Sequence, residues 1–243
     1  MNRMQRGFSS RPFSETVERI RNGLVVSCQA NEGDPMDRPE HLAAFAKSAE
    51  LGGACGIRAC GAENIAAIRA RVALPIIAID KVHHPDSAVY ITPTFADAVR
   101  VAKAGGDIIA LDATSRPRPG GERLDELIAR IRSELRLPVM ADVSTLEEGI
   151  AAERAGADLV ATTLAGYTEY SRKVGGPDLL LVEELVKACS VPVVAEGRFE
   201  TPAQVAEAFR LGAFAVVVGA AITQPIALTR RFVAATAAGR PAE

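Results

Sequence analysis

Residues 191–223 read VPVVAEGRFETPAQVAEAFRLGAFAVVVGAAIT, and this stretch decides the fold. Its two apolar runs predict buried strands, and the amphipathic segment between them predicts a helix. The first strand ends in EGR, Glu196 to Arg198, and the second ends in GAA, Gly219 to Ala221. Such small residues let backbone N–H groups approach an anion, so we expect a phosphate site. Glycines at strand ends can simply turn the chain, but two such ends in succession favour a binding site.

The rest of the chain repeats this pattern. Four glycines that end predicted helices each precede an apolar run, at spacings of 53, 51 and 56 residues: Gly52, Gly105, Gly156 and Gly212. Three apolar runs that open with proline alternate with them, at Pro75, Pro138 and Pro192. Together with GLVVSCQA at residues 23–30, they make eight predicted strands. Apolar strands alternating with amphipathic helices predict a parallel sheet covered by helices.

Eight such units in about 250 residues are typical of the (β/α)8 TIM barrel, here of the phosphate-binding type. We expect one domain over residues 1–243, with residues 1–13 as a flexible extension and a short helix at residues 14–23 closing the barrel bottom. Thr94 and Thr201 are placed to cap helices, and Ser144 with Glu147 fits a capping box. An open doubly wound sheet is the alternative, disfavoured because no G-x-G-x-x-G follows the first strand.

Composition narrows the range of partners. The chain is 48% hydrophobic and has a formal net charge of −2 from 28 basic and 30 acidic residues. This balance disfavours nucleic acid or a membrane surface, so we expect a small molecule. No apolar run approaches the ~20 residues that span a bilayer, and no secretion signal opens the chain, so we expect a cytoplasmic protein. No CxxC pair occurs, and reduced, structural thiols are expected at Cys28, Cys55, Cys60 and Cys189.

Side chains at the carboxyl ends of barrel strands form the active site. Counted from the opening prolines, Lys81, Asp142 and Glu196 all lie at even offsets and are expected on one face. A lysine opposite a carboxylate can be a structural ion pair, but its place beside the phosphate loops favours proton transfer. Lys81 acts as a base only when neutral, which burial or the cation Arg58 would favour by lowering its pKa. Glu196 would return a proton from the opposite face, as an epimerase requires.

The glycine-led strands give a less consistent count. Arg58 is six residues beyond Gly52, whereas Asp112 is seven beyond Gly105. Alternation along a strand therefore places only one of the two side chains in the lumen, unless a bulge or an offset intervenes.

We expect neither a metal site nor covalent hydrolysis. His83 and His84 are neighbours in a loop and His41 stands alone, an arrangement that seldom binds one ion. No G-x-S-x-G motif or Cys/His pairing indicates covalent hydrolysis. Arg116 and Arg118 follow the fourth strand, where contact with an anionic substrate and a solvated loop are equally expected.

Nine segments resemble the N-acetylmannosamine-6-phosphate 2-epimerase family over most of residues 23–232: GLVVSCQA, GGACGIRA, LPIIAIDK, YITPT, DIIALDATSRPRP, MADVSTLEE, TTLAGYTEYS, VVAEGRFETP and VVVGAAIT. This resemblance implies a TIM-barrel isomerase of bacterial sialic acid breakdown. It would interconvert N-acetylmannosamine 6-phosphate and N-acetylglucosamine 6-phosphate without a cofactor. By the same resemblance, Lys81 and Glu196 would transfer the protons at C2.

The resemblance also implies the binding residues. Sugar contacts are expected from Gln29, Arg58, Asp112, Asp142, Thr163 and Tyr167, and phosphate contacts from Gly197, Arg198, Gly219 and Ala220. Gln224 stands where the family pattern leads us to expect an arginine, so phosphate affinity is expected to depend more on Arg198, or on Arg230 and Arg231. His83 and His84 also depart from the pattern beside Lys81. A homodimer is a possible assembly.

Two other functions fit the same residues. A Schiff-base aldolase acting on a sugar phosphate would use Lys81 as its nucleophile. A sugar-phosphate-binding barrel would recognise its ligand without turning it over.

Overall fold

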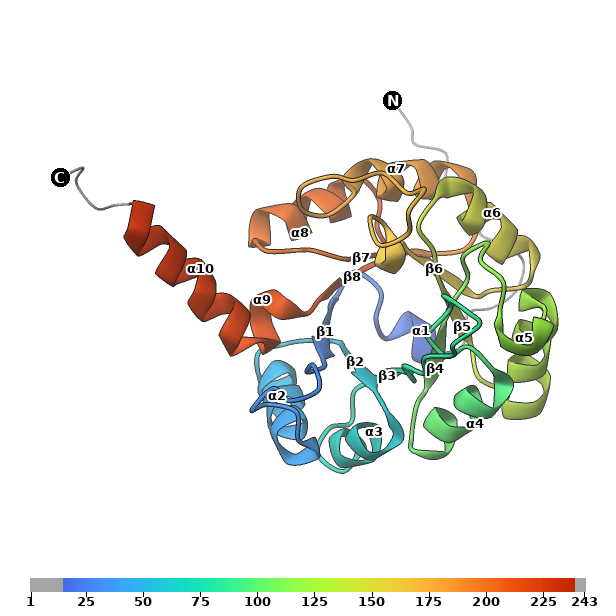
Figure 1. The fold of residues 1–243 in the computed structure, drawn as a ribbon, viewed down its shortest axis with the longest axis horizontal. Coiled ribbons are helices and arrows are strands. Elements are labelled where there is room, and N and C mark those ends of the chain that lie inside the picture. The colour runs from blue at the N-terminus through green and yellow to red at the C-terminus, as the bar shows by residue number, and fades with distance from the viewer. Residues whose placement is uncertain (1–14, 239–243) are drawn as a thin grey trace.

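The computed structural model describes residues 15–238, which form a closed ring of parallel strands surrounded by helices (Figure 1). The strands pair in chain order and β8 returns to β1. They are β1 Leu24–Cys28, β2 Gly56–Cys60, β3 Ile76–Ile79, β4 Ile108–Asp112, β5 Val139–Asp142, β6 Leu159–Ala161, β7 Val193–Glu196 and β8 Ala215–Val218. The predicted TIM barrel is confirmed and the open doubly wound sheet is wrong. The predicted extension at residues 1–13 lies outside the described residues.

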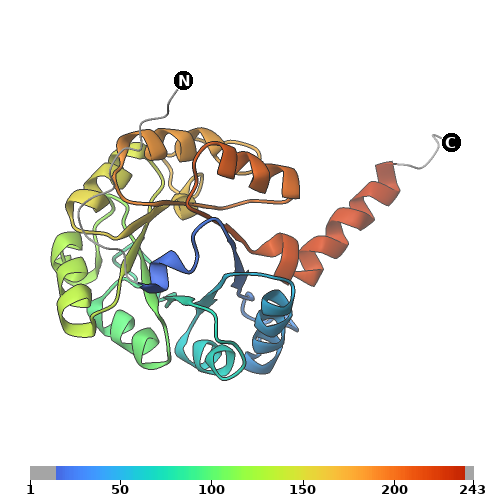
Figure 2. The same cartoon turned by 180° about the vertical axis from the view of Figure 1, so that it is seen from behind.

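Helices cover the outside of the ring, as the view from behind also shows (Figure 2). The α-helices of residues 15–238 are α1 Glu15–Glu18, α2 Pro39–Leu51, α3 Ala62–Arg69, α4 Phe95–Lys103, α5 Leu124–Arg130, α6 Leu146–Arg154, α7 Leu179–Ala188, α8 Pro202–Arg210, α9 Ala220–Thr223 and α10 Pro225–Ala238. A π-helical turn, η2 Ile131–Leu135, continues α5, and two 3-10 turns, η1 Pro119–Gly121 and η3 Thr162–Leu164, lie in loops.

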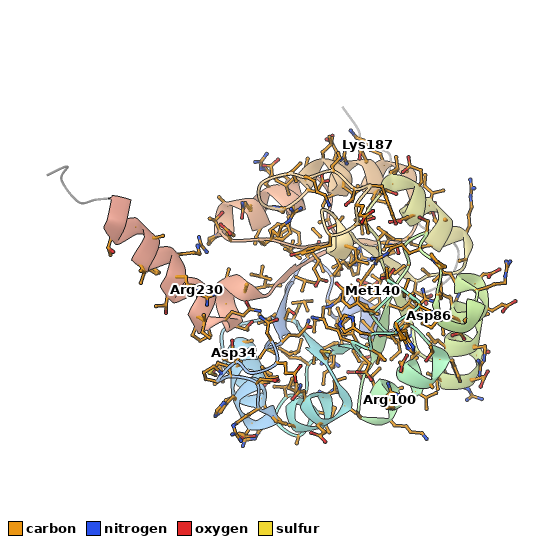
Figure 3. The ribbon with its side chains drawn as sticks, in the orientation of Figure 1. Asp34, Asp86, Arg100, Met140, Lys187 and Arg230 are labelled. Carbon is orange, nitrogen blue, oxygen red and sulfur yellow. The ribbon has the colours of Figure 1, made fainter. Side chains whose placement is uncertain are left out.

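The short helix α1 closes one end of the barrel, as predicted. Val17 is 1% exposed and Ile20 is fully buried, in one cluster with barrel-interior side chains such as Met140. Met140 lies near the centre of the ring (Figure 3). The predicted end of this helix at Gly23 is wrong, because α1 ends at Glu18 and Asn22 adopts the left-handed conformation, with φ of 56°. The Asn22 N–H donates to Phe214 O at 2.7 Å and ties the turn to the start of β8.

The structure resolves the inconsistent count on the glycine-led strands. Gly52 ends α2 in a right-handed conformation, with φ of −78°, so its assignment as the repeating glycine is wrong. Gly53 is the left-handed residue, with φ of 93°, and it corresponds to Gly105, with φ of 109°. Any residue other than glycine would be strained at either position, which explains why glycine recurs there. Arg58 lies five residues beyond Gly53, and Asp112 lies seven beyond Gly105. Both offsets are odd, so the two side chains share the lumen face.

Threonines begin three of the outer helices. Thr94 accepts a hydrogen bond from Asp97 N, and Thr201 accepts one from Gln204 N, in two complete capping boxes. Each box satisfies two N–H groups that the first turn of a helix leaves free. Both predicted caps are confirmed.

The third capping box is shifted by one residue from its predicted position. It joins Thr145 to Glu148, and the predicted pair of Ser144 and Glu147 is wrong. Thr145 is the residue with extended backbone at the helix start, with φ of −139°. Ser144 instead donates its hydroxyl to Glu148 Oε2 at 2.7 Å, so the same carboxylate also fixes the end of β5.

The last helix, α10, extends away from the barrel (Figures 1 and 2). Its side chains Phe232 and Val233 are 76% and 61% exposed. An apolar groove of about 300 Å³ lies near its base on the outside of the barrel and is lined by Leu24, Val205, Val218 and Ile222, among others. Among residues 15–238, no helix combines the length and the apolar character needed to cross a bilayer.

Candidate active site

A buried arginine joins two neighbouring carboxylates at the carboxyl ends of the strands. Arg58 on β2 donates Nη1 to Asp142 Oδ1 at 3.1 Å and Nη2 to Asp142 Oδ2 at 2.5 Å. The same Nη1 donates to Glu196 Oε2 at 2.8 Å. Arg58 is 1% exposed and Asp142 is fully buried, so this ion pair is shielded from solvent. The predicted convergence of Asp142 and Glu196 is observed.

Two threonines of η3 fix Glu196 in place. The Thr162 hydroxyl donates to Glu196 O at 2.8 Å and accepts from Glu196 N at 3.0 Å, which anchors the backbone. The Thr163 hydroxyl lies 2.7 Å from Asp142 Oδ1 and 3.1 Å from Glu196 Oε2. A hydroxyl has one hydrogen, so Thr163 can donate to only one of these carboxylates at a time.

Burial raises the pKa of Glu196 to about 7, with the charge of Asp142 acting in the same direction and Arg58 and Thr163 opposing it. Both protonation states are therefore populated near neutral pH. Glu196 Oε2 is held by Arg58 and Thr163, whereas Oε1 makes neither contact. A carboxyl group of this kind is suited to general acid–base catalysis.

Lys81 lies two residues beyond β3, in a loop stabilised by an antiparallel bridge to Ile91. It lines one cavity of about 330 Å³ together with Glu196. Its neighbour Asp80 accepts from Arg100 of α4 at 3.0 Å, so these adjacent side chains diverge, as the strand count predicts. Of the two conditions considered for a neutral Lys81, burial is not met, because Lys81 is exposed, and the charge of Arg58 is paired with two carboxylates.

The same cavity collects most of the predicted binding residues. Besides Lys81 and Glu196, it is lined by Gln29, Tyr167, Gly197, Arg198, Gly219 and Ala220. Gln29 donates Nε2 to Ser27 Oγ at 2.8 Å, and its buried Oε1 has no hydrogen-bond partner among the described residues. An unsatisfied amide oxygen of this kind is available to accept a hydrogen bond from a sugar hydroxyl or amide.

Four predicted site residues do not line the cavity. Arg58 and Asp142 lie beneath it, and Thr163 reaches it only through Glu196. Asp112 is fully buried and accepts hydrogen bonds from Thr114 Oγ1 at 2.7 Å and Arg116 Nη2 at 2.7 Å. Burial raises its pKa. We infer that Asp112 organises the loop after β4.

Neither arginine of that loop is free. Arg116 pairs with Asp112 at 2.7 Å. Arg118 is 7% exposed and donates to Thr92 O at 3.2 Å and Pro93 O at 3.2 Å, so it joins the loops after β3 and β4. The solvated loop expected for Arg118 is wrong, because backbone carbonyls replace its water.

Arg198 turns its guanidinium toward the loop after β6. Nη1 donates to Val174 O at 2.9 Å and Nη2 donates to Ala165 O at 3.1 Å. Gly166 permits this approach, because a Cβ there would lie 2.7 Å from Arg198 Nη1. The Arg198 Cζ lies 5.8 Å from the centre of the Tyr167 ring. Arg198 therefore fixes one wall of the cavity.

Sequence reasoning missed several residues around the site. Ser27 is paired in register with Arg58, so alternation along β1 could have found it. Strand counting could not have found Thr162 or Glu200, because their positions depend on loop conformations. The same holds for the packing of His83 against Tyr90, whose ring centres lie 5.5 Å apart.

All four cysteines are free, as predicted. Residues 15–238 contain no group of three or more His, Cys, Asp or Glu side chains placed to hold a metal ion.

The fold is a TIM barrel, and a polar cavity lies at the carboxyl ends of its strands. A family model described as "Putative N-acetylmannosamine-6-phosphate epimerase" matches residues 42–238. The chain belongs to this family, which confirms the resemblance seen in the sequence.

Individual relatives are similar over nearly their full length. Two proteins named "Putative N-acetylmannosamine-6-phosphate 2-epimerase" come from Caldanaerobacter subterraneus subsp. tengcongensis and Thermosynechococcus vestitus. The first is 49% identical over 90% of this chain and 93% of its own. The second is 50% identical over 89% of this chain and 94% of its own length. The solved structure of the N-acetylmannosamine-6-phosphate 2-epimerase from Clostridium perfringens matches with a TM-score of 0.89 at 42% identity, covering 94% of this chain and 100% of that one.

Proposed function

We propose that the protein interconverts N-acetyl-D-mannosamine 6-phosphate and N-acetyl-D-glucosamine 6-phosphate, in the breakdown of sialic acid and other amino sugars. Membership of the epimerase family supports the reaction, and the shared cavity of Lys81 and Glu196 is the observation that carries it. The cytoplasm is the proposed location, since all four thiols are free.

Proton transfer at C2 requires the open-chain sugar, whose C1 aldehyde makes the C2 hydrogen acidic. Lys81 removes this proton on one face, and the enolate is reprotonated by Glu196 on the other. Arg58 and Thr163 hold Glu196 Oε2, which leaves Oε1 to carry the proton. Gln29 accepts a hydrogen bond from the sugar, and backbone N–H groups at Gly197, Gly219 and Ala220 bind the phosphate.

A proton NMR time course in deuterium oxide tests this function. We expect conversion of N-acetylmannosamine 6-phosphate with deuterium at C2 of the product, because the incoming proton comes from a group that exchanges with solvent. Cleavage of a C–C bond, with borohydride trapping of a substrate adduct on Lys81, would instead establish the aldolase. Binding without either change would establish a sugar-phosphate-binding protein.

We further infer a homodimer in which α10 of one protomer covers the apolar groove of the other. In this chain α10 extends away from the barrel with Phe232 and Val233 exposed (Figure 1). The groove beside β1 and β8 is apolar and lies on the outside of the same barrel. An unpaired apolar helix and an uncovered apolar groove on one chain are complementary between two copies.

A further inference from the structure

The base of α10 forms part of the cavity wall. Gln224, Ala227, Leu228 and Arg231 all line the cavity. Ala227 and Leu228 lie four and three residues before Arg231, which places these three on one side of α10, and Gln224 directly precedes the helix. The same cavity is lined by Gly197 and Gly219, where the phosphate is proposed to bind. The side chains of this wall are therefore within the surroundings of a bound phosphate.

Three cationic side chains line the cavity: Lys81, Arg198 and Arg231. Lys81 is assigned to proton transfer. Arg198 donates from both of its terminal nitrogens to backbone carbonyls of the loop after β6. Of the two arginines, Arg231 is held more loosely, because its side chain is 47% exposed and its Nη2 lies 3.5 Å from Glu200 Oε2.

The pairing of Arg231 with Glu200 is easily exchanged. Both side chains are about half exposed, and surface ion pairs of this kind contribute little to stability. A phosphate dianion offers Arg231 shorter, charge-assisted hydrogen bonds. The carboxylate of Glu200 lines the same cavity and repels such an anion, so Arg231 also offsets this repulsion.

We propose that Arg231 supplies the side-chain charge that binds the phosphate of the substrate, exchanging Glu200 for the phosphate as the ligand enters. Gln224, which lines the cavity just before α10, is uncharged and cannot do so. Arg230 is adjacent on the same helix (Figure 3) and equally charged, but it does not line the cavity. The identity of the phosphorylated ligand rests on the proposed function.

Steady-state epimerisation by four variants tests this role. We expect Arg231→Gln to raise KM for N-acetylmannosamine 6-phosphate at least tenfold with kcat within about threefold of wild type. Arg230→Gln, the matched control, leaves both constants unchanged. Gln224→Arg added to Arg231→Gln restores part of the lost affinity, since it returns a cation to the cavity lining. Glu200→Gln lowers KM. If the pair only anchored α10, Glu200→Gln and Arg231→Gln would be equally harmful, and that result would overturn the proposal.

A binding measurement separates this inference from the proposed function. Calorimetric titration with glucose 6-phosphate needs no turnover, and we expect Arg231→Gln to weaken its binding at least tenfold relative to Arg230→Gln. Loss of binding in a protein that epimerises nothing would support Arg231 and overturn the proposed function. Normal epimerisation with unchanged KM and unchanged titration in Arg231→Gln would overturn the role of Arg231 alone.

Discussion

Arg58 Nη1 lies 2.8 Å from Glu196 Oε2, so a buried guanidinium of β2 holds the carboxylate that ends β7 across the barrel. The same guanidinium binds Asp142 through both terminal nitrogens. Arg58 thereby carries one positive charge between two negative ones. This arrangement leaves Glu196 able to hold a proton near neutral pH, since burial and Asp142 outweigh the favourable contact with Arg58.

Replacing the proposed base tests its role directly. We expect Lys81→Met to lose at least about a hundredfold in kcat, the lower range for removing a positioned base. Lys187→Met is the control, because Lys187 lies on the outer helix α7 and is 69% exposed (Figure 3). If the Lys81→Met protein is folded and turns over substrate as fast as Lys187→Met, Lys81 is not the base.

The pH dependence of kcat/KM reports on Glu196. In the direction that starts from N-acetylglucosamine 6-phosphate, Glu196 accepts the C2 proton and must be a carboxylate, a form that is lost below its pKa of about 7. We therefore expect kcat/KM to rise with pH until about 7, and Glu196→Gln to lose this rise together with at least about a hundredfold in kcat. The substrate phosphate also ionises, with a pKa of about 6, and this contribution to the pH profile is the same for the wild type and Glu196→Gln. A rise near pH 7 that persists in Glu196→Gln would assign it to another group.

Thr163 is predicted to position the proton on Glu196. Its hydroxyl lowers the pKa of Glu196, so Thr163→Val should move the rise in kcat/KM to higher pH. Removal of this buried hydrogen bond should also lower the free energy of unfolding by about 1 kcal/mol. Thr163→Ser keeps the hydroxyl and should retain the wild-type profile. Identical pH profiles for the valine and serine variants would show that the hydroxyl acts on folding alone.

Light scattering during gel filtration tests the proposed dimer. Phe232 is 76% exposed in the single chain, so Phe232→Asp should leave the barrel folded but convert the dimer to a monomer. Leu180→Asp places the same charge on an exposed apolar position of α7, 53% exposed, and should leave the dimer intact. A monomeric wild type, or equal masses for the two variants, would contradict the interface.

Local sequence patterns were sufficient to predict the barrel, because the alternation of apolar strands and amphipathic helices is visible in the residues of each segment. Alternation from Pro75, Pro138 and Pro192 also predicted which of Lys81, Asp142 and Glu196 share a face. The count failed at Gly52, where the neighbouring Gly53 adopts the left-handed conformation. Two adjacent glycines have equal intrinsic freedom, so only the folded chain distinguishes them.

Contacts between distant segments could not be predicted in the same way. Arg198 donates to carbonyls more than twenty residues away, and Arg58 lies beneath the cavity that it was expected to line. Their positions depend on how loops after different strands pack together. The direction of α10 is likewise not encoded by its periodicity, because an amphipathic helix specifies an apolar side but not what will cover it.

The helix α10 belongs to the cavity at its base and extends beyond the barrel in its outer half. A partner that fixes the outer half also fixes the cavity wall that carries Arg231. Ligand affinity and association of the subunits then become reciprocally coupled through one rigid element, each increasing the other by the same factor. Dilution of the protein would weaken substrate binding, and saturating substrate would hold the subunits together.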